Sequence, residues 1–193
     1  MSKKKKLTGE EALAAAYAEV DHTPLLTALG VDISDEHLCL ALTHRSFANE
    51  NGHLPNNERL EFLGDAVLGL SIAAKLYERY PSRPESDISK MRASIVSRYG
   101  LSDVAREIEL GKHILLGKGE QTTGGRDKDS ILADTTEAIL GAIYRQHGFE
   151  VARQVILNLF AANIENAVVS GRHMDWKTTL QELCAELKAA MPV

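Results

Sequence analysis

Acidic residues recur at helical spacing in two separate segments of the chain. The first segment carries Glu58, Glu61 and Asp65, and the second carries Asp134 and Glu137. At about 100° per residue, the three acids of the first segment fall within roughly 60° of one another on one helix face. The two acids of the second segment lie three residues apart and therefore also share a face. Each segment is predicted to be a helix with a carboxylate face.

Small and apolar residues accompany the acids on these two helices. In the second helix, Gly141 continues the face of Asp134 and Glu137 without a side chain, and with Ala138 it allows another helix or a substrate to approach closely. The first helix is predicted to pack against the core through four apolar residues, Leu60, Leu63, Val67 and Leu70.

Carboxylates gathered on one face repel each other, and a bound cation is the best compensation. Like charges at this spacing cost a few tenths of a kcal/mol per pair, roughly, even when exposed. Arg59 is the only cation among residues 57–68, and residues 131–144 contain none. Oxygen ligands without histidine or thiolate favour Mg²⁺ or Mn²⁺ over zinc.

Two other interpretations of the acids stay open at this point. They can be ordinary solvated helix faces, since acids three residues apart are common. A di-iron helical bundle would use Glu-x-x-His pairs, which Glu19–His22 and Glu50–His53 match in letters. The second pair contains an Asn-Gly step that breaks a helix, and neither pair lies in a carboxylate segment, so this interpretation is weak.

Apolar periodicity predicts helices along most of the chain. No window between residues 21 and 170 alternates for long enough to require a strand, so the fold class is predicted to be all-α. The stretch from residue 111 to 128 is polar and glycine-containing and is predicted to be a loop. Helix starts are expected at Ser34, Asn56 or Asn57, Ser86, Leu101, Ser130 and Glu150, and helix ends near His44, Tyr80, Ile108, His147 and Ala167.

The composition is that of an ordinary globular protein. Of the 193 residues, 44% are hydrophobic and 25% are charged, which excludes global disorder. No apolar run approaches the roughly 20 residues of a membrane-spanning helix. No apolar stretch follows the lysines at positions 3–6, so a cytoplasmic protein is expected. Cys39 and Cys184 lie far apart and are expected to be buried free thiols. The net charge of −5 argues, taken alone, against a general nucleic-acid binder.

The carboxylate segments resemble the motifs of a known enzyme family. Residues 58–66, ERLEFLGDA, look like the nine-residue signature of the ribonuclease III family, and residues 134–137, DTTE, resemble its second acidic motif. Residues 43–47 and 124–125 are also similar to residues that bacterial members carry. The resemblance covers roughly residues 23–190.

The resemblance implies an all-α, homodimeric endonuclease. Such an enzyme hydrolyses phosphodiester bonds in double-stranded RNA with Mg²⁺-activated water, and Mn²⁺ can substitute. It leaves 5′-phosphate and 3′-hydroxyl ends with short 3′ overhangs, and it processes ribosomal and messenger RNA. The resemblance implies neither an organic cofactor nor a membrane partner.

The resemblance also assigns roles to individual residues. Glu61, Asp65, Asp134 and Glu137 are implied to be the catalytic, metal-ligating set. Glu58 and Glu85 match auxiliary acids, although an exposed acid in a turn is an equally good interpretation of Glu85. Phe62 matches an aromatic that family members insert into the partner subunit.

Three regions are expected: a basic or helical tail at 1–20, the nuclease domain at 21–171, and a linker with a further helix at 172–193. The last region is similar to the first helix of a double-stranded-RNA-binding domain, where Thr178 and Gln181 match RNA-contacting positions. Because the chain ends at Val193, that domain is expected to be truncated, and the lack of such a basic module accounts for the negative charge. Exposed cations are weaker candidates for RNA contacts: Arg92, Arg98, Arg126 and Lys128.

Two other classes of function remain to be weighed. A non-cleaving double-stranded-RNA-binding factor on the same fold has no need to keep all four acids. A purely structural helical dimer predicts no dependence on Mg²⁺.

Overall fold

The computed structural model of the chain describes residues 8–170, and within that range the fold is helical. The one strand-like pairing among these residues is an isolated bridge between Thr43 and Leu115, so the all-α prediction is confirmed. None of the helices in residues 8–170 is long and apolar enough to cross a membrane. The elements are α1 (Glu10–Ala18), α2 (Thr23–Leu29), α3 (Asp35–Leu42), α4 (Arg45–Glu50), α5 (Glu58–Arg79), α6 (Glu85–Ile95), α7 (Arg98–Glu107), η1 (Leu110–Lys112), α8 (Lys118–Thr122), η2 (Gly125–Asp127), α9 (Asp129–His147), α10 (Phe149–Leu159) and α11 (Ala161–Ser170).

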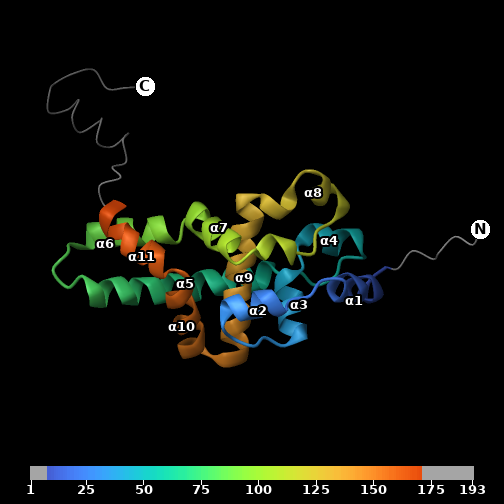
Figure 1. The fold of residues 1–193 in the computed structure, drawn as a ribbon, viewed down its shortest axis with the longest axis horizontal. Coiled ribbons are helices and arrows are strands. Elements are labelled where there is room, and N and C mark those ends of the chain that lie inside the picture. Colours follow the sequence, from blue (N-terminus) through green and yellow to red (C-terminus); the bar gives the residue numbers. More distant parts are fainter. Residues whose placement is uncertain (1–7, 171–193) are drawn as a thin grey trace, which may run out of the picture.

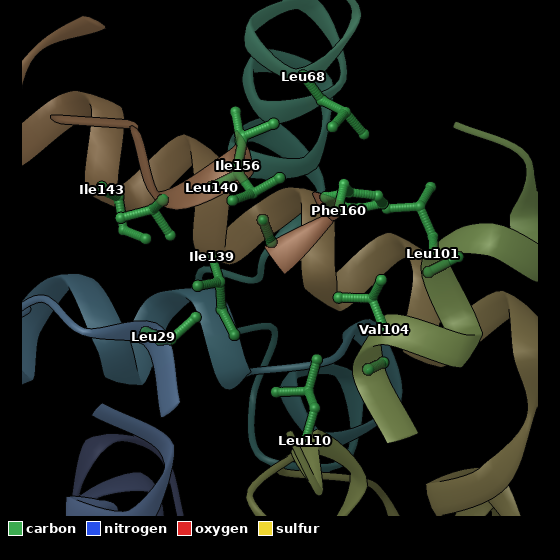
Figure 2. Packing of buried hydrophobic residues seen from close by; sticks show 14 of the residues in the cluster. Leu29, Leu68, Leu101, Val104, Leu110, Ile139, Leu140, Ile143, Ile156 and Phe160 are labelled. Atoms are coloured by element: carbon green, nitrogen blue, oxygen red, sulfur yellow. The ribbon is translucent and has the colours of Figure 1, made fainter. Parts of the chain in front are cut away.

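The two longest helices, α5 and α9, cross at the centre of the molecule, and the shorter helices pack around them (Figure 1). The core is one cluster, formed by residues of α5 and α9 and of the helices packed around them. Leu68 of α5, Leu140 of α9 and Ile156 of α10 point toward one another, with Phe160 beside them (Figure 2). All four side chains are fully buried. Burial of apolar side chains such as these is the main favourable contribution to folding.

The start of α5 is fixed by two asparagines with different tasks. Asn56 Oδ1 accepts the Glu58 backbone N–H at 3.1 Å, which satisfies one of the free donors at the helix start. Asn57 is buried and its side-chain amide donates to the Ala41 carbonyl at 3.3 Å. This second bond ties the carboxylate-bearing helix to the end of α3. The predicted bounds of α5 are confirmed.

Several predicted helix starts are wrong. Helix α7 begins at Arg98 because the Ser97 hydroxyl accepts the Gly100 N–H at 3.1 Å and so caps the helix three residues earlier than predicted. The prediction of serine caps at residues 86 and 130 fails: α6 starts after Pro84, and α9 starts after Lys128, in each case without a side-chain cap. The predicted cap at Ser34 is confirmed, since its hydroxyl accepts the His37 N–H at 3.4 Å.

The segment 111–128 is more ordered than its glycines and polar residues indicate. It contains the last two residues of η1 and the whole of α8 and η2, and it buries Ile114, Leu115 and Leu116. The prediction of a polar loop is therefore wrong. The predicted single helix over residues 150–167 is also divided, because α10 ends at Leu159 and α11 begins after the buried Phe160.

The N-terminal lysines, Cys184, Thr178, Gln181 and the region 172–193 lie outside the described residues. Of the tail expected at 1–20, α1 is helical, and Tyr17 at its end packs against the core and donates a hydrogen bond to Asp35 at 3.0 Å. Cys39 is a free thiol but only half-buried.

Candidate metal centre

The crossing of α5 and α9 brings three carboxylates together. One oxygen each from Glu61, Asp134 and Glu137 can be chosen so that all three lie within 4.8 Å of one another. Glu61 comes from α5, and the other two come from α9. All three side chains are half-buried, so their charges are only partly screened by water.

Burial and mutual repulsion both act on the charges of this group. Burial, followed by the charges of Asp65, Glu61 and Asp134, raises the pKa of Glu137 to about 8. Burial is also the main cause that raises the pKa of Glu61 and that of Asp134. None of the ion pairs formed within residues 8–170 involves these acids. A set of carboxylate oxygens without a cation matches the ligand chemistry of a hard divalent ion.

Asp65 lies at the border of this group. It is exposed and does not belong to the set of three within 4.8 Å. Its negative charge nevertheless raises the pKa of both Glu61 and Glu137. The four acids predicted from the sequence thus divide into three clustered carboxylates and one more exposed neighbour.

The two auxiliary acids lie apart from the cluster. Glu58 pairs with Arg45 at 3.5 Å, although its charge still raises the pKa of Glu61. Glu85 is exposed at the start of α6, where it accepts a hydrogen bond from Ser89. Glu61 lies roughly 27 Å along α5 from the end of that helix at Arg79, and Glu85 begins α6 beyond that end, so the two acids are far apart within one chain.

The cations predicted to contact RNA differ in whether their side chains already form hydrogen bonds or ion pairs within the protein. Arg126 Nη1 donates to the carbonyls of Gly111, Lys112 and Ile114 at 2.9, 3.1 and 3.0 Å. Lys128 Nζ donates to Glu120 at 2.6 Å. Both side chains therefore hold the segment 111–128 together.

Arg92 and Arg98 are exposed and form no ion pair within residues 8–170. The charge of Arg98 lowers the pKa of Asp134, in opposition to burial. It is therefore a cation at the edge of the carboxylate group. From the sequence, Arg98 is predicted only as a general RNA contact, because the proximity of Arg98 to α9 depends on how α7 packs.

An apolar stripe follows the outer face of α5. Phe62, Leu70 and Tyr77 are 80%, 57% and 77% exposed, and they lie within about 80° around the helix axis. The prediction that Leu70 packs into the core is wrong, because the buried face of α5 centres near Ser71, about 100° further round. An exposed stripe of large apolar residues is typical of an interaction surface.

Comparison with known proteins identifies the family of this chain. Residues 34–164 match the model of the family described as Ribonuclease-III-like, and this stretch contains all four acids. The chain belongs to the ribonuclease III family. A relative named Ribonuclease 3 from Corynebacterium glutamicum is 73% identical over 189 residues, which are 98% of this chain and 76% of the relative. A Ribonuclease 3 from Mycobacterium tuberculosis is 61% identical over 84% of this chain and 69% of the relative.

Solved structures of the family have the same fold. The nuclease domain of ribonuclease III from Campylobacter jejuni, described with a region involved in dimer formation, superposes with a TM-score of 0.69 at 40% identity. The superposition covers 74% of this chain and 98% of that domain. Dicer from Pichia stipitis superposes with a TM-score of 0.53 at 26% identity, over 72% of this chain and 59% of Dicer.

Proposed function

We propose that this family member cleaves double-stranded RNA at the carboxylate cluster, with Mg²⁺ bound there and Mn²⁺ able to replace it. The observation that carries the proposal is the close approach of Glu61, Asp134 and Glu137. They are half-buried, come from two crossing helices and form no ion pair within residues 8–170. The relatives named Ribonuclease 3 support the reaction class.

In this proposal, each acid has a definite task. Glu61, Asp134 and Glu137 hold the cation, and Asp65 supplies a fourth carboxylate from the more exposed side. When bound, Mg²⁺ lowers the pKa of a water molecule and neutralises charge on the scissile phosphate. The helices keep the carboxylates in place, so little reorganisation is needed when charge develops during the reaction.

The substrate is proposed to be recognised by shape and charge. Duplex RNA is read mainly through its phosphates and 2′-hydroxyls. Arg92 and Arg98 are exposed cations, and the charge of Arg98 acts on Asp134 of the cluster, so we assign both to phosphate contacts. Thr178 and Gln181 in the region 172–193 are proposed as further contacts. Products would carry 5′-phosphates, 3′-hydroxyls and short 3′ overhangs, with ribosomal and messenger RNA as the substrates processed.

A second copy of the chain is the proposed partner of the apolar stripe on α5. Phe62 would insert into that copy, and Leu70 and Tyr77 would extend the contact along the helix. The exposure of all three large side chains on one face supports this assignment. The Campylobacter jejuni domain, described with a region involved in dimer formation, supports it too.

A non-cleaving RNA-binding role is not favoured. Such a protein needs no cluster of carboxylates that repel one another, yet all four acids are present. The high identity to relatives named Ribonuclease 3 points in the same direction.

The test is cleavage of a long, fully paired RNA at low salt, with Mg²⁺ and with chelator. Low salt strengthens phosphate contacts and so favours binding by a chain of net negative charge. Cutting is expected only with the metal. Glu137→Gln, which keeps the side-chain shape but removes a ligand charge, should lose at least about a hundredfold in rate. Glu165→Gln, an exposed acid on α11, is the matched control and should cut normally.

Calorimetric titration with Mn²⁺ separates the roles of the acids. Glu137→Gln should weaken binding more than Asp65→Asn, because Asp65 lies outside the set within 4.8 Å. Normal cleavage by Glu137→Gln would show that the active site lies elsewhere. Cleavage in the presence of chelator would contradict metal dependence.

A further inference from the structure

Two glycines face each other where α5 crosses α9. A Cβ atom placed on Gly64 would lie 1.8 Å from the carbonyl oxygen of Glu137. A Cβ atom placed on Gly141 would lie 2.2 Å from the carbonyl oxygen of Leu60 and 3.2 Å from the Gly64 nitrogen. The two helices therefore touch through their backbones, and each glycine makes room for the other helix.

This backbone contact involves the same turns that carry the metal ligands. Gly64 lies against Glu137, which is itself a ligand of the proposed site. Gly141 lies against Leu60, whose carbonyl is joined directly to the nitrogen of Glu61. A shift between the helices at this contact would therefore move the ligands of α5 relative to those of α9.

We infer that Gly64 and Gly141 are positioning residues, which set the spacing of the carboxylate cluster by allowing α5 and α9 to meet backbone to backbone. The inference rests on the proposed metal site. Real Cβ contacts essentially never fall below 3.0 Å. An alanine at either position therefore forces the helices apart by roughly 1 Å. Functional constellations tolerate displacements of only about 0.5 Å, so this shift is large enough to open the cluster.

Other glycines of the chain supply matched controls. Gly69 lies on α5 too, but a Cβ there meets nothing within 4 Å, so Gly69→Ala tests the substitution without a clash. Gly111 is as tightly packed as Gly141, with the Arg126 carbonyl 2.1 Å from its Cβ position, but it lies in the segment 111–128 rather than at the crossing. Gly111→Ala therefore tests a clash of similar severity away from the ligands.

The experiment measures Mn²⁺ affinity, by calorimetry or electron paramagnetic resonance, for Gly64→Ala, Gly141→Ala and the two controls as full chains. Circular dichroism and thermal melts report folding for each variant. At least one of the crossing variants should stay helical at low temperature and bind Mn²⁺ at least tenfold more weakly. Gly111→Ala should melt earlier but bind Mn²⁺ normally, and Gly69→Ala should do neither.

A crystal structure of Gly141→Ala without metal gives a second, independent measurement. We expect the oxygens of Glu61 to lie farther from those of Asp134 and Glu137 than in the unchanged chain. A folded variant with unchanged carboxylate spacing and Mn²⁺ affinity would overturn the inference. Failure of both crossing variants to fold, while Gly111→Ala folds, would assign the contact to stability alone and also overturn it. If the unchanged chain binds no Mn²⁺, the proposed metal site fails, and the carboxylate spacing in this crystal structure still decides the role of the glycines.

Discussion

His22 and His113 meet inside the protein although they lie 91 positions apart in the sequence. Their Nδ1 atoms are 3.0 Å apart, and the residues are only 8% and 4% exposed. A hydrogen bond between two such nitrogens needs one protonated and one unprotonated Nδ1, and two positively charged rings would repel each other. Tyr17 stacks on His22, so the pair links the N-terminal helices to the segment after η1.

This pair is expected to make the stability of the fold depend on pH. Burial is the main cause that lowers the pKa of both histidines; the carboxylates of Asp21 and Glu109 oppose this shift, and Lys112 adds to it at His113. The unfolded chain takes up protons near the ordinary histidine pKa of about 6.5, whereas the folded chain resists them. The contribution of the His22–His113 pair to the free energy of unfolding is therefore fully present above pH 7 and is lost as the pH falls below about 6.5.

Thermal melts between pH 7.5 and pH 5 test this expectation. His113→Gln keeps a polar side chain that does not titrate, so its Tm should fall by a few degrees less than that of the unchanged chain over this range. His53→Gln, a change at an exposed histidine, should follow the unchanged chain. Equal pH dependence in His113→Gln would contradict the assignment.

Spacing along the chain could identify the four acids but not their relative positions. Helical periodicity places Glu61 and Asp65 on one face, and Asp134 and Glu137 on another. Which three of them come within 4.8 Å depends on where α5 crosses α9, and that is set by contacts between residues far apart in sequence. The histidine pair is beyond sequence reasoning for the same reason.

At the level of the elements, periodicity succeeds where a helix packs regularly and is flanked by clear stop signals. The bounds of α5 follow from its pattern and from the prolines at 81 and 84. The start of α7 depends on one hydroxyl, that of Ser97, and the break between α10 and α11 lies at Phe160, whose backbone departs from helical geometry. The apolar pattern encodes neither of these features.

Arg126 is the residue that organises the segment 111–128. Its side chain donates hydrogen bonds to three backbone carbonyls of this segment, two of them at 2.9 and 3.0 Å. Arg126→Ala should therefore destabilise the fold by about 1–3 kcal/mol, as expected for lost bonds to a charged donor. Chemical denaturation measures this loss.

Arg92→Ala is the matched variant for this prediction. Arg92 is exposed, and no hydrogen bond from its side chain is formed within residues 8–170, so its removal should leave stability within about 0.5 kcal/mol. RNA affinity at low salt should instead fall for Arg92→Ala. Unchanged stability of Arg126→Ala, with weakened RNA binding, would show that Arg126 serves the RNA rather than the fold.

At the level of the whole molecule, the apolar stripe on α5 predicts self-association. Leu70 lies between Phe62 and Tyr77 and away from the carboxylate cluster, so a charge there disturbs the stripe without altering the site. Leu70→Asp should shift the chain from dimer to monomer, because a buried, unpaired carboxylate is costly at an interface. Light scattering after size exclusion measures the mass directly.

The control places the same charge on an equally exposed aromatic elsewhere. Tyr99 is 70% exposed on α7, off the stripe, and Tyr99→Asp should remain dimeric. Because association follows mass action, the comparison is made over a range of concentrations, and the Leu70 variant should need at least tenfold more protein to dimerise. If Leu70→Asp stays dimeric and Tyr99→Asp becomes monomeric, the interface lies on α7 rather than on α5. If the unchanged chain is itself monomeric, the proposal that a second copy covers the stripe is wrong.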